Sequence, residues 1–389
     1  MIVKIGDVIS EYSVRNKFDE NIPVYSVTNE KGFCTGYFSK EVASKDKSTY
    51  KIVPRGYFAY NPSRINVGSV DWQKYEDRVI VSPLYVVFGV SDRLDRQYLL
   101  HYLKSDMMLS FIKEYATGSV RDNLKLADLG KFPINLRPVE EQCQIATTLD
   151  KIDDLIAKRR QQLDKLDELV KSRFIEMFGD VIRNSKAWQM RVFEDVAASR
   201  LGKMLDAKQQ TGKYSYPYLA NFNVQWFRFN IENLNQMDFD EDDRAEFELK
   251  DGDLLVCEGG EIGRCAVWHN EIQPCFFQKA LHRVRCNRQI IHPDYLAWWF
   301  KYNCDYDGFT AIAGSKATIA HLPGIKLKQL QVAVPPIELQ EQFATFVEQT
   351  DKSKYRQEKC IGFFQCLEKT LDRSGYDVEF WLSQNEKRI

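Results

Sequence analysis

The chain has 389 residues, enough for two domains, and its apolar fraction of 44% and charged fraction of 28% are typical of a globular protein. No run approaches the roughly 18 uncharged apolar residues of a membrane span, no signal peptide is visible at the start, and nine cysteines without a C-x-x-C pair favour a reducing cytoplasm. The net charge of −1, from 54 basic and 55 acidic side chains, argues against nucleic-acid binding when the chain is taken whole.

Five segments of the first half recur in the same order in the second half. The pairs are 5–8 with 193–196, 23–29 with 217–223, 56–60 with 252–256, 98–104 with 295–301, and 138–147 with 336–345. The offset grows from 188 to 198 residues along the chain, as small insertions would cause. We therefore expect a tandem duplication.

Taken in chain order, the elements predict five regions. Short β-rich runs such as 78–88 and 281–286 lie between turn residues, and amphipathic helices follow near 95–115 and 294–302. Each such mixed region is followed by a long helical pattern. The predicted boundaries are a first α+β domain at 1–137, a first spacer helix at 138–180, a second domain at 181–335, a second spacer helix at 336–373 and a tail at 374–389.

The two long helices carry apolar residues at alternating spacings of four and three, which is typical of a coiled-coil seam. In the first helix the seam residues are Ile145, Leu149, Ile152, Ile156, Leu163, Leu166, Val170 and Met177, with Arg159 and Arg173 at the two remaining positions. In the second helix they are Phe343, Val347, Ile361, Phe364 and Leu371, with Thr350, Lys354 and Gln357 as a polar middle. Gly179 is expected to end the first helix.

Neither helix can bury its seam alone. We expect the two helices to pair antiparallel as a coiled coil, with one domain at each end and an approximate internal twofold. The alternative, that each helix packs on a partner protein, stays open, and both arrangements can hold together.

This plan resembles the specificity subunit of type I restriction-modification enzymes. The motifs that carry the resemblance are the helix starts 137–142 and 335–343, the segments 149–153, 348–352, 117–120 and 313–316, and the domain segments 57–64 and 252–264. The resemblance covers nearly the whole chain. Single motifs are weak, but two domains and two helices with paired helix starts are a specific combination.

The resemblance implies a non-catalytic, sequence-specific DNA-binding subunit of an anti-phage system. Two target recognition domains would each read one half of a bipartite double-stranded DNA target, and the paired helices would set the gap between the halves. Two methyltransferase (modification) subunits would dock on the chain and methylate adenines, and restriction/translocase subunits would add DNA translocation and cleavage. S-adenosylmethionine, ATP and Mg²⁺ are then expected only on partner subunits.

Enzyme motifs are missing from the sequence. The segment 61–64, Asn-Pro-Ser-Arg, lacks the second proline and the aromatic residue of an adenine methyltransferase pocket. The glycines of 258–264 fit neither a dinucleotide loop nor a phosphate loop, and predict a tight turn. No acid-x-Lys follows the single Pro-Asp at 293–294, and the five histidines form no H-E-x-x-H. Cys257, Cys265, Cys275 and Cys286 alternate with apolar residues as buried small hydrophobes do.

The near-zero net charge divides unevenly along the chain. Residues 1–137 carry +4 and 181–335 carry 0, whereas 138–180 carry −3 and 336–389 carry −2. Without the acidic run 238–248, which has seven acids and one arginine, the second domain would carry +6. Because an acidic run cannot face phosphate, we expect it on the surface away from DNA.

Polar and aromatic side chains of the two domains are the candidate base readers, since Asn and Gln pair with adenine and Arg with guanine. In the first domain these are Tyr60, Asn61, Ser63, Arg64, Asn66, Arg121 and Asn123. In the second they are Lys203, Lys208, Asn221, Asn223, Arg264, Gln278, Lys279 and Lys316. Each of them could instead be an ordinary loop residue. Two other function classes stay open: a protein–protein scaffold or anti-phage adaptor without a DNA role, and a stand-alone methyltransferase, which the missing motifs disfavour.

Overall fold

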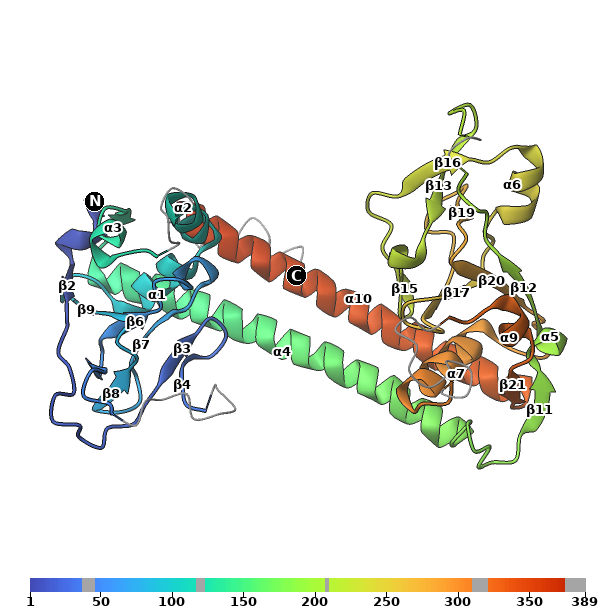
Figure 1. Ribbon diagram of the computed structural model, residues 1–389, viewed down its shortest axis with the longest axis horizontal. Coiled ribbons are helices and arrows are strands. Elements are labelled where there is room, and N and C mark those ends of the chain that lie inside the picture. Colours follow the sequence, from blue (N-terminus) through green and yellow to red (C-terminus); the bar gives the residue numbers. More distant parts are fainter. Residues whose placement is uncertain (37–45, 117–122, 207–209, 310–320, 375–389) are drawn as a thin grey trace. The chain divides into compact units, whose positions relative to one another are not determined.

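The computed structural model describes residues 1–36, 46–116, 123–206, 210–309 and 321–374 (Figure 1). The predicted residues Arg121, Lys208 and Lys316, the segments 117–120 and 313–316, and the tail beyond 374 lie outside this part of the chain. The chain divides into two compact units, Met1–Gln161 with Glu358–Ile389, and Gln162–Gln357.

The first unit is an α+β domain joined to parts of both long helices. Its helices are α1 Arg96–Lys104, α2 Asp106–Ala116, α3 Leu126–Leu129 and the 3₁₀ turns η1 Ile5–Asp7 and η2 Ile65–Val67. Its strands are β1 Ile2–Lys4, β2 Ile9–Glu11, β3 Ser26–Thr28, β4 Gly32–Cys34, β5 Lys51–Pro54, β6 Phe58–Tyr60, β7 Val70–Trp72, β8 Arg78–Val81, β9 Val86–Val90 and β10 Pro133–Asn135.

An antiparallel sheet in the order β2-β9-β6-β7 forms the centre of this domain. Successive side chains of a strand point to opposite faces. Phe58, Tyr60 and Phe88 therefore enter one core together with side chains of α1, while Ala59 and Val87 enter a second core on the other face. Both faces of the sheet are covered.

The second unit repeats this plan with further strands. Its helices are α5 Phe193–Val196, α6 Glu241–Phe247, α7 Pro293–Asp305, α9 Gly324–Lys328 and the 3₁₀ turn η4 Asn221–Asn223. Its strands are β11 Gln189–Val192, β12 Ala197–Leu201, β13 Ser215–Leu219, β14 Val224–Gln225, β15 Arg228–Phe229, β16 Asn235–Asp238, β17 Leu254–Cys257, β18 Cys265–Val267, β19 Phe276–Phe277, β20 Leu281–Cys286 and β21 Gln331–Val334.

The two units share the topology that a duplication predicts. The sheet order β12-β20-β17-β18 is that of β2-β9-β6-β7, strand for strand along the sequence repeat. A two-stranded antiparallel ribbon before each long helix is also repeated, as β1-β10 and as β11-β21. The α+β fold with two tandem domains and two long helices is thus confirmed.

The long helices are α4 Val139–Phe178 and α10 Ile337–Ser374, close to the predicted 138–180 and 336–373. α4 stops at Gly179, whose φ of +72° is the left-handed conformation that glycine adopts without strain. The Gly179 N–H donates to the Ile175 carbonyl at 2.8 Å, as in a helix cap.

In each unit, parts of α4 and α10 pack side by side with opposite chain directions (Figure 1). In the first unit Leu149, Ile152, Ile156 and Leu367 are buried together, and Ile145, Ile361 and Phe364 are partly buried against them. In the second unit Val170, Met177, Phe343 and Val347 belong to the main core. Leu163 and Leu166 are half-buried, and the Leu371 side chain lies outside the described part of the chain.

Two residues of α4 extend the seam beyond its predicted members. Phe174 and Phe178 are 1% and 0% exposed, and both rings contact Phe343, with centroids 5.5 and 5.4 Å apart. The four-three spacing misses them because this end of α4 packs on α7 as well as on α10.

The polar middle of α10 makes specific contacts. Lys354 Nζ lies 2.7 Å from the Asp167 carboxylate of α4 and 3.2 Å from Asp351. Burial acts to lower the pKa of Lys354, but the bonds to Asp167 and Asp351 outweigh it and the pKa is raised. Thr350 is buried, and its hydroxyl donates to the Phe346 carbonyl at 2.8 Å. Gln357 is half-buried.

A buried glutamine in the first turn of each long helix joins it to its domain. The Gln142 Oε1 accepts the Asp95 N–H at 2.8 Å, and its Nε2 donates to the carbonyls of Arg93 and Arg137 at 2.9 and 2.7 Å. Gln340 repeats the arrangement in the second unit, with the His292 N–H at 2.8 Å and the carbonyls of Ile290 and Pro335 at 3.1 and 2.7 Å. Both side chains are 0% exposed.

Candidate nucleic-acid interface

In the first unit, the loop between β6 and β7 and the end of β3 form one polar surface. Asn61 follows β6, and its Oδ1 accepts the N–H of Ser63 at 3.1 Å and its hydroxyl at 3.0 Å. Ser63 and Arg64 are exposed. The Ser69 hydroxyl donates to the Val27 carbonyl at 2.7 Å, so the two segments are held together.

A small cavity of about 190 Å³ lies between these segments. The residues that line it are Ser26, Val27, Thr28, Asn29, Asn61, Arg64, Val67, Ser69 and Tyr85. Amide, hydroxyl and guanidinium groups dominate this lining, and they are the groups that hydrogen-bond to base edges and phosphates.

In the second unit, the corresponding segments are tied more tightly. η4 follows β13, and the Asn221 Nδ2 donates to the Gly259 carbonyl at 2.9 Å in the loop between β17 and β18. The Arg264 guanidinium donates back to the Asn221 carbonyl and to its Oδ1, each at 3.1 Å. Asn221 and Arg264, which the sequence proposes separately, therefore act as one pair.

Both domains thus bring the same two repeat-related loops together. The sequence repeat at an offset of 194 pairs Asn29 with Asn223 and Thr28 with Phe222, at the end of the first loop. Asn29 and Phe222 are exposed members of these surfaces that were not among the predicted residues. Their place inside the repeated segments 23–29 and 217–223 was the signal that could have found them.

Three predicted base readers are instead structural and require correction. Tyr60 is 0% exposed, its hydroxyl donates to the Leu124 carbonyl at 3.0 Å, and burial raises the pKa of its phenol well above the usual range. Asn223 is 1% exposed, with its amide used by Ala220 and Asn230. Lys203 is bound by the Asp238 carbonyl and the Asp243 carboxylate. None of the three presents its polar group to an external ligand.

The remaining described candidates lie on the domain surfaces. Asn66 and Gln278 are half-buried, whereas Asn123 and Lys279 are exposed. Their contact with DNA stays a prediction.

Five of the seven acids in the run 238–248 are exposed, whereas Asp238 is buried and Asp243 is half-buried; that the run faces away from DNA stays a prediction. Asp238 is buried and accepts the N–H groups of Thr211, Gly212 and Tyr214. Asp240 caps α6, where its side chain accepts the Asp243 N–H at 2.9 Å. The run therefore shapes the 210–214 turn and starts a helix.

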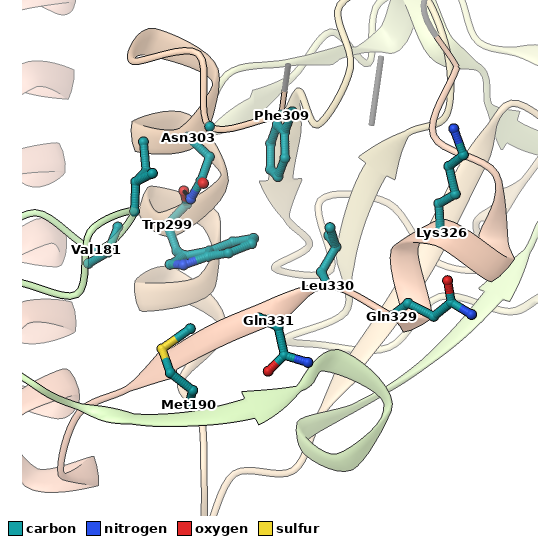
Figure 2. A pocket seen from close by; sticks show the side chains of 11 residues that line it. Val181, Met190, Trp299, Asn303, Phe309, Lys326, Gln329, Leu330 and Gln331 are labelled. Atoms are coloured by element: carbon teal, nitrogen blue, oxygen red, sulfur yellow. Dashed lines mark hydrogen bonds between the residues drawn. The ribbon is translucent and has the colours of Figure 1, made fainter. Parts of the chain in front are cut away.

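The second unit also contains cavities and buried thiols outside these loops. A cavity of about 450 Å³ in the second unit is lined mainly by core and amide side chains, with Lys326 as its one charged residue (Figure 2). Among the described residues no three His, Cys, Asp or Glu side chains converge as metal ligands. All nine cysteines are free thiols. Burial raises the pKa of Cys257 to about 11 and of Cys275 and Cys286 to about 12, so these thiols stay protonated and unreactive.

None of the helices in the described part of the chain is long and apolar enough to cross a bilayer. The fold defines a duplicated protein of two α+β domains, each with a polar loop surface, and two long helices. The sequence profile of the type I restriction modification DNA specificity domain matches residues 2–168 and again 185–360. The chain belongs to this family.

Known relatives resemble parts of the chain. It is 25% identical over 168 residues to the putative type I restriction enzyme MjaX specificity subunit of Methanocaldococcus jannaschii, covering 42% of this chain and 39% of that protein. It is 20% identical over 268 residues to the type I restriction enzyme EcoKI specificity subunit of Escherichia coli, covering 65% and 58%. The alignments thus span less than two thirds of these relatives' own length.

The likeness in fold extends further. The crystal structure of the type I restriction-modification system S subunit from M. genitalium superposes with a TM-score of 0.57 at 14% identity. The superposition covers 96% of this chain and 95% of that one.

Proposed function

We propose that this chain is the DNA-recognition subunit of a type I restriction-modification complex. Each domain reads one half of a bipartite double-stranded target, and α4 and α10 set the gap between the halves and dock two modification subunits. The observation that carries the proposal is the repeated loop pair, Asn29 with Asn61 and Arg64 in the first unit and Asn221 with Arg264 in the second.

The chemistry of these loops suits recognition of a duplex. An arginine can donate two hydrogen bonds to guanine, and an asparagine can bond adenine through its amide. Arg64 is exposed, whereas the Arg264 side chain is 18% exposed and already orders Asn221. Arg64 would therefore contact DNA directly, while Arg264 would also orient the Asn221 amide.

The chemical step belongs to partner subunits in this proposal. Adenine methylation requires the target base to leave the stack and enter a methyltransferase pocket. S-adenosylmethionine would bind on the modification subunits, and ATP and Mg²⁺ on restriction/translocase subunits, while this chain selects the site. The proposed function does not involve a membrane.

The direct test is methylome sequencing of a host that expresses this chain together with its modification subunit. We expect a bipartite methylated adenine motif that disappears when the chain is deleted. A methylome that stays the same with and without the chain would refute the proposal.

A scaffold or adaptor without a DNA role is the second candidate, and salt-dependent affinity separates the two. We expect the full chain to bind a 40-bp duplex that carries the motif, with affinity falling as salt rises. Arg64→Ala and Arg264→Ala should weaken binding. Arg183→Ala removes the same charge from an 87%-exposed side chain outside the loops and serves as the matched control. A scaffold predicts no duplex binding at any salt concentration.

A further inference from the structure

One large apolar side chain lies at the centre of the second unit's candidate loop surface. Phe222 is 57% exposed, and it is the middle residue of η4, between Asn221 and Asn223. Among the described aromatic side chains, none packs its ring against Phe222. Single exposed phenylalanines are common on protein surfaces, and exposure alone does not indicate a binding role. The contacts of the surrounding residues must therefore be considered as well.

Both neighbours of Phe222 are held by hydrogen bonds, Asn221 to the β17–β18 loop and Asn223 to residues next to η4. Asn221 is bonded through its amide to Gly259 and through its carbonyl to Arg264. Asn223 is buried, and its Oδ1 and Nδ2 satisfy Ala220 and Asn230 at 2.9 Å each. The backbone on both sides of Phe222 is therefore restrained.

The hairpin that follows η4 is also held in place, by α7 and by the segment from the β17–β18 loop into β18. Phe227, between β14 and β15, stacks on Trp298 of α7 with centroids 4.5 Å apart and an interplanar angle of 16°. Its N–H donates to the Cys265 carbonyl at 3.0 Å, and the neighbouring Trp226 Nε1 donates to Glu261 at 2.6 Å. The chain on both sides of Phe222 is therefore held by specific contacts while the ring itself stays exposed.

The first unit lacks this feature. The repeat pairs Phe222 with Thr28, which is 7% exposed and whose hydroxyl accepts the Lys31 N–H at 3.1 Å. The exposed ring therefore does not follow from the shared fold, and it distinguishes the second domain from the first.

We propose that Phe222 is a wedge that inserts between stacked base pairs of the half-target bound by the second unit. The inference rests on the proposed function. Apolar side chains on DNA-binding loops insert at base steps, partly unstack them and bend the duplex. Asn221 and Arg264 hold the duplex edge beside the ring, so insertion takes place at a fixed step. The unstacking lowers the cost of extruding a neighbouring adenine into a partner's catalytic pocket.

The test uses the full chain and a DNA duplex that carries the motif found by methylome sequencing. The fluorescent base 2-aminopurine is placed in the half of the motif that the second domain reads. That half is identified by exchanging residues 181–335 for the second domain of another family member and finding which half of the motif changes. Binding of the wild-type chain should raise the 2-aminopurine fluorescence, because the base loses its stacking partner. Phe222→Ala should abolish most of this rise and weaken binding about tenfold, in line with the loss of one base–aromatic stack. Phe222→Leu, which keeps an apolar wedge, should retain most of the rise. Ile325→Ala, which truncates a 74%-exposed side chain on α9, should behave as wild type.

Three results would overturn the wedge. Phe222→Ala could keep both the fluorescence rise and the affinity. It could bind DNA normally but lose association with the modification subunit in analytical ultracentrifugation, which would make Phe222 a protein contact. If the wild-type chain shows no motif-dependent binding, the proposed function fails, and the wedge fails with it.

Discussion

Gln142 and Gln340 show how much a single buried side chain organises in this chain. Replacing either by alanine leaves one N–H and two carbonyls without their partner. We expect Gln142→Ala and Gln340→Ala each to lower the free energy of unfolding by about 2–3 kcal/mol, since an unsatisfied buried polar group costs about 1–3 kcal/mol and water recovers part of it. Chemical denaturation measures this loss. Amide exchange of Asp95, which donates to Gln142, should become faster only in the first variant.

The exposed Gln144 provides the matched control for this prediction. Gln144→Ala removes the same amide from the same helix and should change the free energy of unfolding by less than about 0.5 kcal/mol. An equal loss of unfolding free energy in Gln142→Ala and Gln144→Ala would show that the hydrogen bonds between Gln142 and the domain contribute no specific stability.

Asp238 gives a prediction with a defined pH dependence. The Thr211 hydroxyl, followed by the N–H groups of Thr211, Gly212 and Tyr214, holds the pKa of this carboxyl below its usual 3.8. A depressed pKa in the folded state stabilises the fold above pH 3.8, and this contribution is lost as the pH falls through the lower folded-state value. Asp238→Asn should therefore be less stable than wild type at pH 7. Thermal unfolding should show that the difference in melting temperature between the two proteins becomes smaller below about pH 4.

The exposed Asp242 on α6 is the control for Asp238. Asp242→Asn should have the same melting temperature as wild type at pH 7. A difference for Asp238→Asn that stays constant from pH 7 to pH 3 would contradict the assignment of the effect to the ionised carboxylate.

For single residues, the sequence predicted which side chains lie on the loops better than it predicted which way each side chain points. Asn61, Arg64, Asn221 and Arg264 lie in the loops where they were expected. Tyr60 does not, because it ends a strand whose alternation with Phe58 turns both rings into the core. Such alternation is visible over a longer strand, but three residues are too few to show it.

At the scale of elements, the seam of α4 and α10 is the feature most open to a direct test. Ile152 is 4% exposed and packs with Leu149, Ile156 and Leu367. We expect Ile152→Asp to destabilise the first unit by several kcal/mol, because it buries an unpaired charge. Lys151→Asp introduces an aspartate at the neighbouring exposed position of the same helix turn. It should lower the free energy of unfolding by less than about 0.5 kcal/mol. Circular dichroism during urea unfolding distinguishes the two variants.

Leu166 refines this prediction, because it is only half-buried. Leu166→Asp should cost clearly less than Ile152→Asp in the isolated chain. An equal or greater cost would contradict the packing described for the two helices.

The long helices were predictable to within one or two residues because a four-three repeat over nearly forty residues is a strong signal. The small sheets were predictable only as β-rich runs. Their order, such as β12-β20-β17-β18, depends on pairings between strands far apart in sequence, for which a single sequence carries no direct signal.

At the scale of the whole molecule, the duplication predicts a separable function for each domain. Exchanging residues 1–137 for the first domain of another family member should change one half of the methylated motif and leave the other half and the gap unchanged. The reason is that each domain has its own sheet, its own cores and its own pair of loops. Methylome sequencing of the hybrid checks this outcome, and a change in both halves would contradict the assignment of one domain to one half.

The glutamine joints have a consequence for how such chains evolve. The side-chain hydrogen bonds of Gln142 and Gln340 go only to main-chain N–H and carbonyl groups, and no side chain of the domain takes part in those bonds. A domain of unrelated sequence can therefore satisfy the same joint, provided that its backbone follows the same path before the helix. Recombination within the helix-start segments would then deliver a new binding preference on an unchanged support, without compensating mutations in the helix.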